Sequence, residues 1–198
     1  MTITSSEIFE GVNAVAQLGM AVVVGLGVWI AYKQLHSWKD QVAYQKRSEA
    51  AENLLSKAIY VSDEIRALRS PYDQIPIDKV DDKTFALERR YNRFVEKNDL
   101  FENLRKAQVK AEAVLGNDEV GKKIDVLFQV RNEVLTAIDM LISEAQSPST
   151  GPRDRTFEQE LRWTVHGTYS EKYDPLGMRQ LETLGELKQL LRSEISPN

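Results

Sequence analysis

The chain has 198 residues, a formal net charge of −4 and no cysteine. A chain this close to neutral lacks the clustered basic surface of nucleic-acid-binding proteins, and the absence of cysteine excludes disulfides, thiol nucleophiles and cysteine-bound zinc. Hydrophobic residues make up 42% and charged residues 28%, as in a globular protein, so we expect one domain with its own core beyond the N-terminal segment.

Residues 11–32 (GVNAVAQLGMAVVVGLGVWIAY) contain no Asp, Glu, Lys or Arg. Their number is close to the ~20 residues with which an α-helix crosses the hydrocarbon of a bilayer. A cleaved signal peptide has a basic start, a shorter apolar core and a small-residue cleavage site, which this sequence lacks. We therefore predict a transmembrane helix at 11–32 that follows a short extracytoplasmic N-terminus at 1–10. The alternative, a helix buried in a soluble core, disagrees with the charge asymmetry of the flanks.

The two flanks of residues 11–32 differ in charge. No basic residue precedes the segment, and four follow it closely: Lys33, Lys39, Lys46 and Arg47. By the positive-inside rule, this bias places the N-terminus outside and the remaining chain in the cytoplasm. Aromatic rings and lysines around the end of the segment are predicted to anchor it at the cytoplasmic interface: Trp29, Tyr32, Lys33, Trp38 and Lys39.

Small and polar residues within the predicted span indicate a self-association face. Two amides lie four residues apart, and two pairs of small residues have small-x-x-x-small spacing: Asn13 and Gln17, Ala21 and Gly25, Gly27 and Ala31. Small residues let two membrane helices approach closely, and amide side chains can hydrogen-bond between them. The alternative is that glycine and alanine are simply common in single membrane spans.

Beyond Lys33 the helical pattern continues but becomes amphipathic, and neither Gly nor Pro interrupts it before Ser70. We therefore expect one long helix from the membrane to Arg69, ended by Pro71. The alternative is a break in this helix near residues 36–40. Within it, the polar residues 33–50 are predicted to form a helical stalk. Residues 51–198 are predicted to form a cytoplasmic helical bundle.

Residues 70–83 contain two prolines and are typical of a connection. Three apolar residues in this connection can pack onto the bundle: Ile75, Ile77 and Val80. A helix capped by Asp82 or Thr84 is predicted at about 84–115. Its apolar spacing loosens at 97–99, where we expect a kink or a change of register.

Gly116 and Asn117 are predicted to end that helix, and Asp118 to cap the next one, at about 118–145. The helix at 118–145 has the clearest apolar periodicity of the chain. Arg131 is the single charge on its apolar stripe, and we expect it to pair with an acid of a neighbouring helix. The alternative for Arg131 is an anion site.

The last part of the chain is predicted to contain two more helices. A loop at 147–155 precedes a short helix at 156–167, and the final helix begins at Asp174-Pro175, a capping residue followed by proline at the first helical position. No stretch alternates as a strand would. The predicted fold is all-α, with one N-terminal transmembrane helix continuous with an antiparallel bundle of about four to five helices.

No motif in the sequence specifies an activity. Residues 116–123 (GNDEVGKK) match the G-x-x-x-x-G-K of a phosphate-binding loop, but Lys123 stands where that loop needs Ser or Thr, and a helix instead of a strand precedes it. Two histidines, His36 and His166, are too few for a helical metal site. We predict no enzyme activity, no catalytic residue, no cofactor and no metal, and no small-molecule substrate is evident.

The layout of the chain resembles a known group of proteins. After the apolar segment come Tyr32-Lys33-Gln34-Leu35 and Trp38-Lys39, then a polar helix that ends in Ile65-Arg66-x-Leu68-Arg69-x-Pro71, and a leucine-rich helix closes the chain. This order resembles the small single-span helical proteins of unknown function found in many bacterial genomes. The resemblance implies a bacterial inner-membrane location, and it implies no activity and no site residues.

Two functional hypotheses follow. In the first, the protein is a non-enzymatic, membrane-tethered bundle that acts through protein–protein contacts and self-association; its partners are the lipid bilayer and either a second copy or another membrane protein. In the alternative, it is a transmembrane effector of a bacterial defence or toxin–antitoxin system that perturbs the membrane when it oligomerises.

Overall fold

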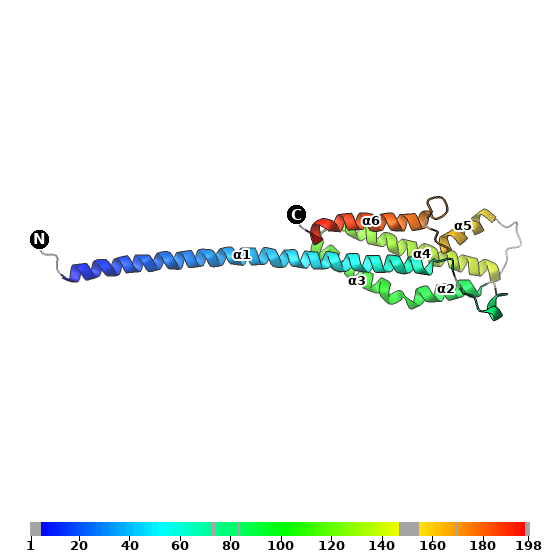
Figure 1. Ribbon diagram of the computed structural model, residues 1–198, viewed down its shortest axis with the longest axis horizontal. Coiled ribbons are helices and arrows are strands. Elements are labelled where there is room, and N and C mark those ends of the chain that lie inside the picture. Colours follow the sequence, from blue (N-terminus) through cyan, green and yellow to red (C-terminus); the bar gives the residue numbers. More distant parts are fainter. Residues whose placement is uncertain (1–4, 73, 83, 147–154, 169, 197–198) are drawn as a thin grey trace. The chain divides into compact units, whose positions relative to one another are not determined.

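The computed structural model describes residues 5–72, 74–82, 84–146, 155–168 and 170–196, with the side chains of these residues described from Gly19 onward except that of Ala21 (Figure 1). The described residues form six α-helices and one short 3-10 helix and contain no strand, which confirms the predicted all-α class. The chain divides into an N-terminal unit, Met1–Gln45, and a C-terminal unit, Lys46–Asn198.

The first helix, α1, spans Ser5–Leu68 and contributes residues to both units. Its end follows from the sequence. The N–H of Arg69 still donates to the carbonyl of Ile65 at 3.0 Å, but Pro71 disfavours a helical conformation in the residue before it and has no N–H of its own. The predicted end of this helix ahead of Pro71 is confirmed.

Two helices, α2 (Phe85–Glu96) and α3 (Asn98–Leu115), stand where the sequence predicts one kinked helix. The interruption is at Lys97, which confirms the predicted position of the irregularity. Asp82, and not Thr84, caps α2, because its Oδ1 accepts the N–H groups of Thr84 at 3.0 Å and Phe85 at 3.1 Å. The Thr84 hydroxyl also donates to Asp82 and lowers the pKa of its carboxyl group.

The turn between α3 and α4 (Asp118–Gln146) depends on Gly116, which has a left-handed conformation with φ 65°. Its N–H donates to the carbonyl of Glu112 at 3.0 Å, as the predicted helix end requires. The cap of α4 differs from the prediction by one residue. Asn117 supplies the capping oxygen, which accepts the N–H of Glu119 at 3.0 Å, and Asp118 is the first helical residue.

The short helix α5 spans Arg155–Val165, and the last helix, α6, spans Pro175–Ile195. The start of α6 confirms the sequence prediction. Asp174 Oδ1 accepts the N–H of Gly177 at 2.8 Å, and Pro175 occupies the first helical position, where its missing N–H is not needed.

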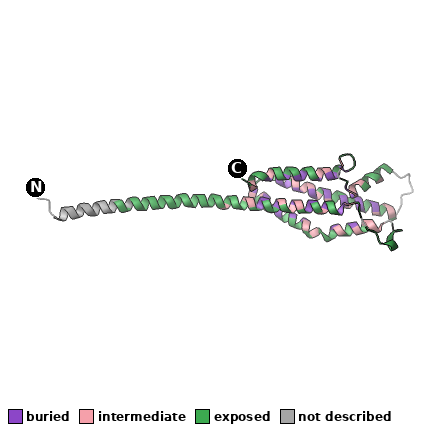
Figure 2. Ribbon diagram, viewed as in Figure 1, coloured by how far each residue is buried: buried purple, intermediate pink, exposed green. Residues whose placement is uncertain are grey.

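The C-terminal unit is an antiparallel bundle (Figure 1). Residues 46–68 of α1, the pair α2–α3, then α4 and α6 run in alternating directions, and α4 packs against α2, α3, α5 and α6. Buried residues line the inner faces of these helices (Figure 2). The largest fully buried apolar side chains come from α1, α2, α3, α4 and α6: Leu54, Ile65, Leu68, Phe94, Phe101, Leu104, Ile124, Leu127, Ile138, Leu187 and Leu191. Each contributes roughly 1.5–3 kcal/mol through burial.

The connection between α1 and α2 does not pack as the sequence predicts. Ile77 is 94% exposed, and Ile75 and Val80 also face solvent, so the expectation that they pack onto the bundle is wrong. The chain turns here through a 3-10 helix, η1 (Ile77–Lys79), that contains no buried residue. Its shape is fixed by polar bonds instead, because the side chain of Arg89 donates to the carbonyl of Gln74 at 2.6 Å.

Candidate functional site

The N-terminal unit presents an exposed apolar stretch of α1. Large apolar side chains between residues 20 and 38 are 48–68% exposed: Met20, Val22, Val23, Val24, Leu26, Val28, Trp29, Ile30, Tyr32, Leu35 and Trp38. Nearly all described side chains of this unit are exposed, with Val42 half-buried (Figure 2). Because adjacent positions of an α-helix point about 100° apart, these side chains lie on every side of α1. We refer to residues 20–38 as the apolar stretch.

No helix within the part of the chain whose side chains are described is long and apolar enough to cross a membrane. Three of the residues predicted to mediate association within the membrane, Asn13, Gln17 and Ala21, lie outside the described side chains. The others are accessible: a Cβ atom added at Gly25 or Gly27 would meet no atom within 4 Å, and Ala31 is exposed.

The five predicted interface residues are all exposed, and three of them, Trp29, Tyr32 and Lys33, lie in ring contacts with neighbours on α1. The ammonium group of Lys33 lies 5.6 Å from the centre of the Trp29 ring, a cation–π distance. Three positions further along, the Tyr32 ring packs against His36 with ring centres 4.9 Å apart. The structure therefore orders these rings along one face of α1 near the end of the apolar stretch.

The C-terminal unit contains a second chemically distinctive feature, a buried ion pair at one end of the bundle. Arg69, at the end of α1, donates to Asp174, at the start of α6, at 2.7 Å, and both side chains are fully buried. Arg69 also donates to the carbonyls of Trp163 and Thr164 at the end of α5. One guanidinium group therefore joins three helices, while its Nη1 has no hydrogen-bond partner within the described residues.

A second buried arginine strengthens this junction. Arg90 of α2 donates to the carbonyl of Ser70 at 2.8 Å, and its Nη1 lies 2.7 Å from Nδ1 of His166. A guanidinium group can only donate, so His166 Nδ1 is the acceptor in this contact and the ring proton is on Nε2. Both arginines bind helix ends and connecting segments, and their groups are closed off from solvent. We therefore interpret the cluster as a structural junction of α1, α2, α5 and α6.

The sequence identifies the members of this junction only as helix ends. Arg69 follows the last apolar residue of α1, Asp174 precedes a proline, and His166 lies beyond the end of α5. No spacing rule links an arginine to an aspartate 105 residues away. The sequence gives one weak indication that Arg69 is buried: an arginine next to the last apolar residue of a helix can point toward the core.

Arg131 does not have the partner predicted for it. Its Nη2 donates to the side-chain amide of Asn98 at 3.1 Å, and its guanidinium group stacks 4.4 Å from the centre of the Phe101 ring. The expected ion pair with an acid is therefore wrong. Burial lowers the pKa of Arg131, and the ring face and one amide take the place of a carboxylate.

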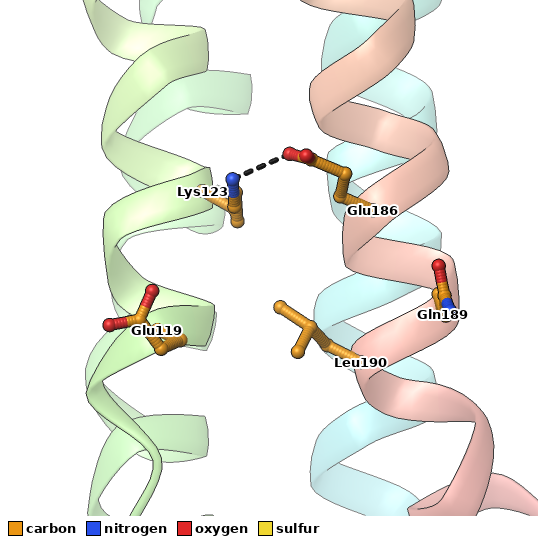
Figure 3. Close-up of a pocket in the computed structure, with 5 residues that line it drawn as sticks. All are labelled: Glu119, Lys123, Glu186, Gln189 and Leu190. Atoms are coloured by element: carbon orange, nitrogen blue, oxygen red, sulfur yellow. Dashed lines mark hydrogen bonds and ion pairs between the residues drawn. The ribbon is translucent and has the colours of Figure 1, made fainter.

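A shallow groove of about 280 Å³ lies between α4 and α6. Figure 3 shows Lys123 and Glu186 facing one another across it, 2.5 Å apart, with Leu190 extending from α6 toward α4. The Glu186 carboxylate accepts from Lys123 and raises the pKa of the lysine. This lysine belongs to the segment that resembles a phosphate-binding loop, and its ion pair holds α4 to α6.

Within the described residues, no group of three or more His, Asp or Glu side chains is placed to hold a metal ion. No protein-family model matches the chain, and no curated protein or solved structure is significantly similar to it. The apolar stretch is therefore the feature of the molecule that points most directly to a function.

Proposed function

We propose that this chain is a non-enzymatic, membrane-tethered helical bundle that acts through protein–protein contacts and self-association at the inner membrane of a bacterium. The N-terminal segment 11–32 enters the bilayer, and the C-terminal unit lies in the cytoplasm. Confining the bundle to a membrane surface raises its effective concentration for other molecules confined there, which is how a tether strengthens weak contacts.

The observation that carries this proposal is the exposure of apolar side chains on every side of α1. Full burial of one such side chain contributes roughly 1.5–3 kcal/mol, so removing several of them from water gains on the order of 10 kcal/mol. A partner helix in water would cover one side of α1 only, whereas lipid covers all sides. The absence of charged residues from residues 11–32 also supports a lipid environment for this segment.

Two double substitutions test the tether. Val22→Arg/Val24→Arg places two charges in the apolar stretch, each of which costs about 2.5–3.5 kcal/mol at the centre of a membrane helix. The matched control Val95→Arg/Val109→Arg changes two exposed valines of α2 and α3 in the C-terminal unit. We expect the unchanged chain and the control in the alkali-washed membrane fraction, and the first variant in the supernatant. Equal membrane retention of both variants would refute the proposal.

A second measurement separates tethering from membrane damage. A tether leaves the bilayer intact, so expression of the full chain should not change the membrane potential reported by a voltage-sensitive dye. Depolarisation that disappears in Asn13→Leu/Gln17→Leu would contradict tethering and favour a membrane effector, because both amides lie in the segment predicted to enter the bilayer.

A further inference from the structure

Five residues of α1 form a continuous aromatic and cationic face: Trp29, Tyr32, Lys33, His36 and Lys39. Each of the five lies three or four residues from at least one of the others, so together they follow one side of the helix. Lys33 lies 5.6 Å from the Trp29 ring centre, and the Tyr32 and His36 ring centres are 4.9 Å apart. We call these five residues the ring–lysine face.

The two lysines of this face are available to bind an anion. All five side chains are exposed, and neither Lys33 nor Lys39 has an ion-pair partner among the described residues. The acid that lies nearest along this side is Asp40, one turn beyond His36, and it reduces but does not cancel the positive charge. The Trp29 ring, 5.6 Å from the ammonium group, restricts the Lys33 side chain, so an anion that binds this lysine has less side-chain motion to restrict.

The position of the face identifies the class of anion. Large apolar side chains fill the turns of α1 before Trp29, and charged and amide side chains become frequent after Lys33, where Leu35 and Trp38 are still apolar. Tryptophan and tyrosine rings favour the headgroup level of a bilayer, and lysines reach the phosphates found there. We propose that the ring–lysine face binds the phosphate of an anionic phospholipid in preference to a zwitterionic one. This inference rests on the proposed membrane tether.

The preference has a physical origin in net charge. A zwitterionic headgroup carries a cation of its own beside the phosphate, and that cation is repelled by Lys33 and Lys39. An anionic headgroup has no such group. One lysine close to an anionic surface increases binding roughly fivefold, so two lysines with Asp40 nearby give a preference on the order of fivefold to tenfold.

The test uses fluorescence from Trp29 in the full chain, with Trp38→Phe and Trp163→Phe as background. The protein is reconstituted in phosphatidylcholine vesicles that contain equal small fractions of either brominated phosphatidylglycerol or brominated phosphatidylcholine. Bromine quenches a nearby indole, so the two quenching constants compare the lipids around the face. We expect several-fold stronger quenching by brominated phosphatidylglycerol, and equal quenching by the two lipids in Lys33→Gln/Lys39→Gln.

A matched control changes the same charge elsewhere. Lys106→Gln/Lys110→Gln alters two exposed lysines of α3 and should keep the preference. Loss of the preference in this control would overturn the proposal, because the effect would then come from the total charge of the chain. Equal quenching of the unsubstituted face by both lipids would also overturn it, while leaving the tether intact. Absence of quenching by either lipid would place Trp29 outside the bilayer and refute both the tether and this inference.

Discussion

Arg69 and Asp174, 105 residues apart in the chain, form an ion pair of 2.7 Å in which both side chains are completely excluded from solvent. Arg105 and Asp125 form a second Arg–Asp pair of the same length, with each side chain 48% exposed. The two pairs differ mainly in burial. Measuring both pairs therefore compares the stabilisation from a buried ion pair with that from an exposed one in the same protein.

We expect Asp174→Asn to lower the free energy of unfolding by about 3–5 kcal/mol, because it leaves the Arg69 charge buried without compensation. Asparagine keeps one oxygen, which can accept the N–H of Gly177, so the cap of α6 is preserved. The amide nitrogen cannot replace Oδ2 as the acceptor for the N–H of Thr168, so the loss contains that hydrogen bond as well as the charge. Asp125→Asn should cost less than about 1 kcal/mol. The measurement is urea denaturation in mild detergent, followed by Trp163, whose ring lies 5.5 Å from that of Tyr173, in a Trp29→Phe/Trp38→Phe background.

Replacement of glycine by alanine should change the free energy of unfolding in opposite directions at Gly116 and Gly185. Gly116 has φ 65°, where a Cβ atom costs roughly 1–2 kcal/mol, so Gly116→Ala should destabilise the C-terminal unit. Gly185 lies within α6, and a Cβ atom there would meet nothing within 4 Å, so Gly185→Ala should stabilise it by roughly 0.5–1 kcal/mol. Urea midpoints that shift in the same direction would contradict the assignment of Gly116 as the left-handed end of α3.

Local signals in the sequence predict most of the helices. Pro71, Gly116 and the pair Asp174-Pro175 each restrict the backbone, so the ends of α1, α3 and α6 follow from single residues. Apolar periodicity predicts the buried faces in the same way, because a helix that packs must present one apolar side to the core.

Contacts between distant residues could not be predicted. The sequence predicts an acid beside Arg131, but the choice among an acid, an amide and a ring depends on how α3 lies against α4. The Arg69–Asp174 pair depends in the same way on the meeting of α1 and α6. Apolar character also failed to predict burial in the connection before α2, where Ile77 faces solvent. The exposure of the rings and lysines on α1 depends on local spacing alone, whereas their place at a membrane interface stays a prediction.

The exposure of Ile77 makes a direct prediction. Ile77→Ala should change the free energy of unfolding by no more than about 0.5 kcal/mol, since the side chain is 94% exposed and loses no packing contacts. Ile138→Ala, at a fully buried position of α4, should cost about 2–5 kcal/mol. Urea denaturation with the Trp163 reporter measures both. A cost of more than about 1 kcal/mol at Ile77 would mean that the connection packs on the bundle after all.

A pH dependence is expected at the ion pair of Arg47 and Glu194. The Arg47 side chain donates to both carboxylate oxygens, at 2.7 and 2.8 Å, and these bonds lower the pKa of Glu194 in the folded protein. A lowered pKa means that the stabilisation is present above the ordinary glutamate value of about 4.3 and is lost as the pH falls through the lowered value.

We therefore expect Glu194→Gln to lower the urea midpoint at about pH 7 and to have little effect at about pH 3. The matched control is Glu171→Gln, which removes the same charge from an exposed loop residue and should have a small effect at both values. An equal loss for Glu194→Gln at both pH values would show that packing of the side chain, and not its charge, stabilises the end of α6.

Disulfide cross-linking can test self-association through α1, because the chain has no cysteine of its own. Asn13, Gln17, Ala21 and Gly25 are each four residues from the last and follow one side of the helix, whereas Gly27 lies on the other side. A side chain at Gly25 or Gly27 meets no atom within 4 Å, so either glycine accepts cysteine without strain.

We expect Gly25→Cys to give more disulfide-linked dimer than Gly27→Cys when membranes that contain the full chain are oxidised and analysed by non-reducing electrophoresis. The physical reason is that small residues and amides let two membrane helices approach along the Gly25 side. Equal yields at the two positions would indicate random collision in the membrane, and a higher yield at Gly27 would move the association face to the side that contains Ala31.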